Sequence, residues 1–129
     1  MVGLDVTMTT LLRAPEFARL RAADTPVARF VSPIVAFYAR FYRGLLGYEA
    51  CALHDPLALG IALDPTLVTH MADLDVRVET EGGLTLGMTV ADRRPLLGPG
   101  FARPQRPVHV PLTVDSPRFV EQLMRACLA

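Results

Sequence analysis

Apolar residues recur along this chain with two periods, three to four residues in one long stretch and two residues in others. After Thr25 the spacing of three and four predicts one amphipathic helix, with Thr25 as its cap. Gly44 or Gly47 would end this helix, and Pro33 is expected to kink or split it. Its apolar positions are Val27, Phe30, Val31, Ile34, Val35, Tyr38, Phe41 and Tyr42.

Proline also marks the starts of three further helices. Pro15 followed by Glu16 places proline at a first helical position and an acid in the first turn. Asp55-Pro56 is a second such start, with Asp55 as cap and residues 57–63 expected to be buried. Ser116-Pro117 is the third, and the inward side of that last helix would consist of Phe119, Val120, Leu123, Met124 and Cys127.

Strict alternation of apolar and polar residues predicts strands in the second half of the chain. Residues 74–78 alternate, and residues 84–90 alternate again after a turn at Glu81-Gly82-Gly83, which predicts an antiparallel β-hairpin. Residues 108–114 would form a third strand. At the other end, residues 1–7 are predicted to form an initial apolar core strand.

Together these elements predict a mixed α/β fold in a single domain over residues 1–129. The expected order is one initial core strand, three or four helices, an antiparallel β-hairpin plus a third strand, and a C-terminal helix. Strands and helices do not alternate strictly, so a complete doubly wound sheet is not expected. Because 51% of the residues are hydrophobic and only 20% charged, either the core is densely packed or part of the surface is covered by other protein.

Charge and cysteine content narrow the classes of function. The formal net charge is zero and all 13 basic residues are arginine, so no basic surface for nucleic acid is expected. No uncharged apolar run is long enough to cross a membrane, and a cytoplasmic location is expected. Cys51 and Cys127 have no metal or redox spacing; a disulfide between them is open, although two buried thiols are the favoured interpretation.

Candidate chemistry concentrates in one imidazole, one carboxylate and two phenols. His54-Asp55 stands before a proline, where such a pair is usually only a helix start. Tyr38 and Tyr42 lie four residues apart on one helix face, so they either belong to the core or line a pocket where a base could stack.

Four stretches, in order and at compatible distances, give the chain a resemblance that extends over its whole length. They are residues 1–7 (MVGLDVT), 37–42 (FYARFY), 51–58 (CALHDPLA) and 80–92 (TEGGLTLGMTVAD). In these stretches the chain resembles the C-terminal portion of the nucleoside hydrolases, the inosine-uridine preferring nucleoside N-ribohydrolase family. The resemblance implies the C-terminal part of that fold, taking part in purine or pyrimidine salvage.

The same resemblance implies roles for the four candidate residues. Members of the family cleave the N-glycosidic bond of ribonucleosides to ribose and free base, with calcium holding the sugar and the attacking water. By position, Asp55 would be a calcium ligand, His54 would protonate the leaving base, and Tyr38 and Tyr42 would line the base pocket. Imidazole suits the acid role, because its protonation changes near neutral pH.

One part of the family's site has no counterpart in these residues. Calcium takes six to eight oxygen ligands, and the family's aspartate cluster, DxDxxxDD, does not occur here. We therefore expect the chain to be inactive by itself, and to act with a complementing N-terminal fragment or as a homo-oligomer on a ribonucleoside substrate. The alternative is a non-catalytic remnant that serves as an oligomerising or interaction module; preference for purine or pyrimidine stays open.

Overall fold

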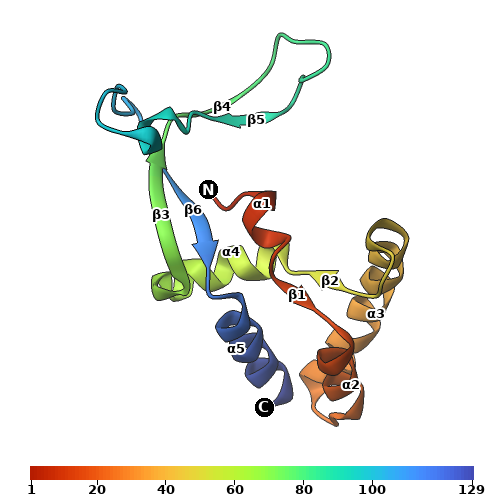
Figure 1. Ribbon diagram of the computed structural model, residues 1–129. Helices are drawn as coiled ribbons and strands as arrows, with labels where there is room; N and C mark the ends of the chain where they lie inside the picture. Colours follow the sequence, from red (N-terminus) through yellow and green to blue (C-terminus); the bar gives the residue numbers. More distant parts are fainter.

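The computed structural model describes residues 1–129 as a cluster of helices from which an arm of strands extends (Figure 1). The mixed α/β prediction is confirmed. In chain order the elements are α1 (Leu4–Thr7), β1 (Leu11–Leu12), α2 (Ala14–Ala22), α3 (Pro26–Leu46), β2 (Cys51–Ala52), α4 (His54–Leu63), the 3-10 turn η1 (Pro65–Leu67), β3 (Val68–Leu74), β4 (Val76–Val78), β5 (Thr89–Ala91), η2 (Arg94–Leu97), β6 (Val108–Val114) and α5 (Ser116–Leu128).

Residues 1–67 and 115–129 form the first region, here called the helical part. It encloses one core of 14 buried residues, to which α1, α2, α3, α4 and α5 all contribute. Helix α4 runs through the middle of this region, and α5 packs beside it (Figure 1). A Cβ on Gly60 of α4 would collide with the Phe119 ring of α5, so the missing side chain is what lets these two helices approach.

Helix α3 has the predicted ends but a different inward face. The Thr25 hydroxyl accepts a hydrogen bond from the Ala28 N–H at 3.0 Å, and Gly47 ends the helix with φ of 79°. Of the kink or split expected at Pro33, the split is wrong, because α3 continues through the proline as one helix of 21 residues.

The buried residues of α3 are Ala28, Val35, Ala39 and Tyr42, so two of the four are alanines. Most of the other large apolar side chains of this helix are exposed, which the sequence did not predict. These exposed residues are Val27, Phe30, Ile34, Phe37, Tyr38, Phe41 and Leu45.

The initial core strand predicted for residues 1–7 is wrong. Residues 4–7 form the single-turn helix α1, in which the Thr7 and Met8 N–H groups donate to the Gly3 and Leu4 carbonyls at 3.1 and 2.9 Å. A short apolar run fits either a strand or a helix, and here the turn buries the adjacent side chains of Val6 and Thr7 together. The first strand is β1, which pairs antiparallel with β2.

Residues 68–114 form the second region, here called the β arm. Strand β4 pairs antiparallel with β5 and β6 is formed, so the predicted hairpin and third strand are confirmed. Strand β3, which pairs antiparallel with β6, was not predicted, and it includes Leu74 from the predicted first arm of the hairpin. The second arm of the hairpin is shorter than predicted, since only residues 89–91 pair. Leu84 is fully exposed in the connecting loop. The Glu79 carboxylate stabilises that loop by accepting the N–H groups of Glu81 and Gly82 at 2.7 and 2.9 Å.

Helices α4 and α5 differ in how well they match expectation. In α5 the Asp115 carboxylate caps the helix, and Phe119, Met124 and Cys127 are buried as predicted. In α4 only Leu57 is buried, whereas Leu59 and Leu63 are exposed, so the prediction that residues 57–63 are buried is wrong.

Two remaining expectations concern the thiols and membranes. Cys51 and Cys127 are free and buried, and burial raises the pKa of both thiols. None of the helices combines the length and the hydropathy needed to cross a bilayer.

Candidate functional site

Both ring nitrogens of His54 form hydrogen bonds with side chains from two other helices. It is the first residue of α4, directly after β2 and the capping residue Leu53. Its Nε2 lies 2.7 Å from the hydroxyl of Tyr42 on α3. Its Nδ1 lies 2.7 Å from the Thr7 hydroxyl on α1. The imidazole is thus fixed in direction by segments separated by 12 and 47 positions from it.

The two groups that hold the imidazole are less accessible than the imidazole itself. Thr7 is 3% exposed and Tyr42 5%, whereas His54 is half-buried. Burial, followed by the neighbouring Cys51 and Tyr38 charges, raises the pKa of Tyr42. The Tyr42 hydroxyl therefore keeps its proton at neutral pH and can donate a hydrogen bond.

Asp55 follows His54 in the first turn of α4 and is more exposed than His54. It is exposed, and it does not cap the helix as predicted, because Leu53 occupies the cap position. A carboxylate in a first turn is stabilised by the helix dipole. The structure has no group of three or more His, Cys, Asp or Glu side chains arranged to hold a metal ion.

An apolar cavity of about 300 Å³ lies against this site. Tyr38, His54 and Asp55 all line it, together with core residues of α2, α3 and α5. Tyr42 does not line the cavity and contacts it only through His54. Of the four residues singled out in the sequence, three therefore share one cavity wall, and the fourth holds His54 from behind.

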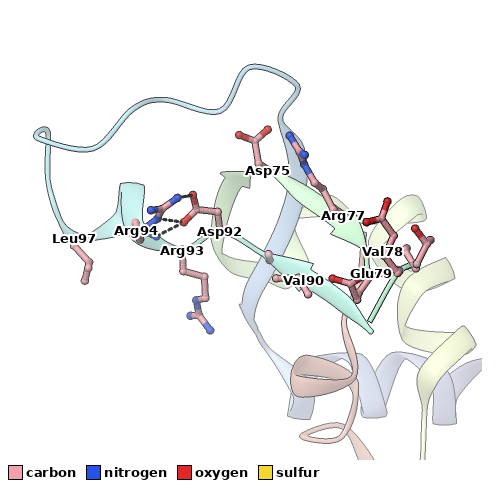
Figure 2. Close-up of a pocket in the computed structure, with 12 residues that line it drawn as sticks. Asp75, Arg77, Val78, Glu79, Val90, Asp92, Arg93, Arg94 and Leu97 are labelled. Atoms are coloured by element: carbon pink, nitrogen blue, oxygen red, sulfur yellow. Dashed lines mark hydrogen bonds and ion pairs between the residues drawn. The ribbon is translucent and has the colours of Figure 1, made fainter. Parts of the chain in front are cut away.

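A larger hollow of about 990 Å³ lies far from His54, on the β arm (Figure 2). Two of its four carboxylates, those of Glu79 and Asp92, form hydrogen bonds with neighbouring residues. Arg94 donates to Asp92 through Nη2 at 2.7 Å and Nε at 2.9 Å, and these contacts lower the pKa of Asp92 to about 2. Backbone N–H groups of Glu81 and Gly82 likewise lower the pKa of Glu79. The lowered pKa values make Glu79 and Asp92 weak bases, and none of the four residues singled out in the sequence lines this hollow.

The remaining histidines lie outside the candidate site. His70 and His109 are exposed on β3 and β6, where the His109 Nδ1 lies 2.6 Å from Asp73. Thr7 is the member of the site that sequence reasoning missed. It lies inside the first of the four resembling stretches, but no spacing rule connects it with a histidine so far along the chain.

Comparisons with known proteins agree on one family. A family model described as inosine-uridine preferring nucleoside hydrolase matches residues 1–121. The chain is 42% identical over 94 residues to the inosine-uridine preferring nucleoside hydrolase of Crithidia fasciculata, covering 73% of this chain and 30% of that protein. It is 38% identical over 99 residues to a pyrimidine-specific ribonucleoside hydrolase of Shewanella sp. (strain MR-7), covering 76% and 31%.

Solved structures give the same result for the fold. A plant nucleoside hydrolase superposes with a TM-score of 0.85 at 26% identity, over 98% of this chain and 40% of that one. The purine-preferring ribonucleoside hydrolase from Gardnerella vaginalis superposes with a TM-score of 0.80 at 36% identity, over 98% and 38%. The chain spans about a third of the length of these curated relatives, so the fold is a partial one.

Proposed function

This chain belongs to the inosine-uridine preferring nucleoside hydrolase family, and from that premise we propose that it forms the leaving-group side of a ribonucleoside hydrolase site. It is the C-terminal part of an enzyme that cleaves the N-glycosidic bond to give ribose and a free base. The observation that carries the proposal is His54, held by Tyr42 and Thr7 at the wall of an apolar cavity.

His54 serves as the general acid of this reaction. When the bond between the sugar and the base breaks, its electron pair goes to the base nitrogen, which must take up a proton. An imidazolium can donate that proton, and the hydrogen bonds to Tyr42 and Thr7 hold the His54 ring at the cavity wall. Water supplies the hydroxyl group that the sugar carbon gains.

The base is held by the apolar cavity and by Tyr38. The cavity of about 300 Å³ has twelve hydrophobic residues among the fifteen that line it, and a planar base is largely apolar on its two faces. Tyr38 is 49% exposed and lines the cavity, where a nucleobase could stack on its ring. Tyr42 contributes to this binding only indirectly, by fixing His54.

Asp55 is proposed as one oxygen ligand of a calcium ion. Its carboxylate fits that part because it is exposed at the cavity and caps no backbone N–H of α4. Calcium takes six to eight oxygens, so the other ligands have to come from outside these residues. A bound ion would orient a water molecule and lower the pKa of that water. We propose that this chain alone does not hold calcium and is inactive.

The test is reconstitution with the missing ligands. The chain is co-expressed with the part of the Crithidia fasciculata relative that it does not match, and ribose release from inosine and uridine is measured with and without calcium. We expect ribose release from the assembled complex with calcium, none from the chain alone, and weaker calcium binding in Asp55→Asn. A complex that assembles and binds calcium but releases no ribose would contradict the proposal.

The second candidate function is a non-catalytic oligomerising module, and the exposed face of α3 favours it. Phe30, Phe37 and Phe41 are between 62% and 72% exposed, although most apolar patches of this kind are covered in a stable protein. Self-association that depends on these rings, in a chain that forms no active complex, would favour this second candidate.

A further inference from the structure

The sheet of β3 and β6 has one covered edge and one open edge, and we propose that the open edge, β3, pairs with β3 of a second copy of this chain. Strand β6 lies between β3 and the start of the chain, and α1 packs against it (Figure 1). The Met1 nitrogen donates to the His109 carbonyl of β6 at 2.7 Å. No helix or strand packs along the outer side of β3 (Figure 1), so that edge is open to a partner.

The register of the sheet shows which backbone groups of β3 face outward. Met71 is opposite Pro111, and Asp73 is opposite His109. Antiparallel strands alternate between residue pairs that exchange two hydrogen bonds and pairs that exchange none. Pro111 has no N–H to donate, and the His109 carbonyl is directed to Met1, so both pairs are of the second kind. The N–H and C=O groups of Met71 and Asp73 therefore point away from β6, and no loop or helix of the chain bonds to them.

Strand β3 lacks the features that usually keep an edge strand from pairing. Such edges are commonly protected by proline, by charged side chains or by a bulge. The proline of this sheet, Pro111, is on β6. The Asp73 carboxylate of β3 lies 2.6 Å from Nδ1 of His109 on the neighbouring strand, so it is engaged within the sheet. The register shifts are confined to residues 68–71, and the regular stretch that follows can accept an added strand.

The charges along β3 favour a second copy of the same strand in one register. When two copies run antiparallel with Met71 opposite Met71, the outward N–H and C=O of each Met71 bond to those of the other. Asp73 of each copy then stands opposite Thr69, so a carboxylate meets a hydroxyl. Centring the pair on Asp73 instead would place two carboxylates opposite each other, which is destabilising. A twofold pairing of this kind uses the same surface on both copies.

The centre of this contact also buries apolar surface. Met71 is 43% exposed, and directly opposite residues in a sheet have Cβ atoms about 4.5–5.5 Å apart, so the two Met71 side chains would touch. Because β3 is already extended against β6, it loses little conformational freedom on pairing. The contact is small, so we expect a dimer whose formation depends on concentration.

The first experiment is hydrogen exchange of the backbone amides in the 15N-labelled chain, measured by NMR in dilute and in concentrated solution. The Ala72 N–H belongs to the ladder with β6 and should exchange slowly at both concentrations. The N–H groups of Met71 and Asp73 should exchange fast in dilute solution and at least about tenfold more slowly in concentrated solution, because they then have acceptors. In Met71→Pro, which removes one outward donor and no bond to β6, the Asp73 N–H should stay fast at both concentrations.

A cysteine cross-link tests the register. In Met71→Cys the two introduced residues would have Cα atoms about 5.5 Å apart, within the range of a disulfide. Thr69→Cys is the matched control on the same exposed strand, because its two thiols would lie about 13 Å apart along the strands. With oxidised glutathione we expect a disulfide-linked dimer from Met71→Cys and at least about tenfold less from Thr69→Cys. The native thiols of Cys51 and Cys127 are buried, so they contribute little.

Four results would overturn the inference. They are exchange at Met71 and Asp73 that does not depend on concentration, equal cross-linking of the two cysteine variants, a folded Met71→Pro variant in which Asp73 N–H becomes protected as in the wild type, and protection that appears only when a complementing N-terminal fragment is added. The wild-type exchange and the cross-links decide the matter even if Met71→Pro fails to fold. None of these measurements uses ribose release, so they leave the proposed function to its own test.

Discussion

The helical part and the β arm use their polar groups in different ways. In the helical part, a core of 14 buried residues supports a histidine whose two ring nitrogens are held by side chains from α1 and α3. In the β arm, the hydrophobic cluster has only three buried residues (Ala72, Leu74 and Val110), and the carboxylates of Glu79 and Asp92 stabilise loops of their own strands. The β arm has the larger hollow, but the helical part has the imidazole that is held on both sides. We therefore place the candidate functional site where packing fixes a side chain, and not at the larger hollow.

The largest expected difference between the two regions is in stability. Leu57, in α4 beneath His54, is 0% exposed, and Leu57→Ala is expected to lower the free energy of unfolding by about 2–5 kcal/mol. Leu84, in the loop of the β arm, is fully exposed, and Leu84→Ala is expected to change it by less than about 0.5 kcal/mol. Urea unfolding curves of both variants measure these values. Equal losses would show that the two regions do not differ in packing.

A second difference concerns association through α3. If the exposed rings of α3 contact another copy, Phe37→Ser with Phe41→Ser should weaken self-association at least about tenfold, because aromatic rings dominate such contacts. Leu86→Ser, which removes an exposed apolar side chain from the β arm, is the control. Sedimentation velocity over a range of concentrations measures both variants. A chain that is monomeric before any substitution would exclude the oligomerising module.

The smallest expected effect is a local titration in the β arm. Arg94 holds the pKa of Asp92 at about 2, below its ordinary value of 3.8, so this contact persists at neutral pH and is lost as the pH falls through about 2. Arg94→Gln should return the pKa of Asp92 toward 3.8. Carboxyl-carbon NMR during an acid titration follows the change. An unchanged midpoint would mean that Arg94 does not stabilise the Asp92 carboxylate.

Local signals in the sequence predicted most of the elements correctly. Thr25 caps α3, Gly47 ends it, and α5 begins at Ser116, because caps and helix-ending glycines act through neighbouring residues. The failure at α1 has the opposite cause. Nothing within residues 1–7 decides between strand and helix, and the contact of Thr7 with His54 that fixes the segment is not local.

The inward face of α3 could not be predicted from periodicity either. Apolar residues occur on both sides of the helix, so its period predicts a helix without indicating which side is buried. The core accepts the side with Ala28 and Ala39, whose small side chains allow close packing, and leaves Phe30 and Phe41 outside. Within the site, the adjacency of His54 and Asp55 was visible in the sequence, whereas the shared cavity wall with Tyr38 needed the fold.

The most direct test of the central claim compares one residue from each region in the reconstituted complex. Ribose release is measured for His54→Ala and for Arg77→Ala, whose side chain lines the larger hollow of the β arm (Figure 2). If His54 is the general acid, His54→Ala lowers the rate by about 10²–10⁴-fold, and Arg77→Ala leaves it unchanged. An unchanged rate in His54→Ala, or a comparable loss in Arg77→Ala, would contradict the assignment of the site to the helical part.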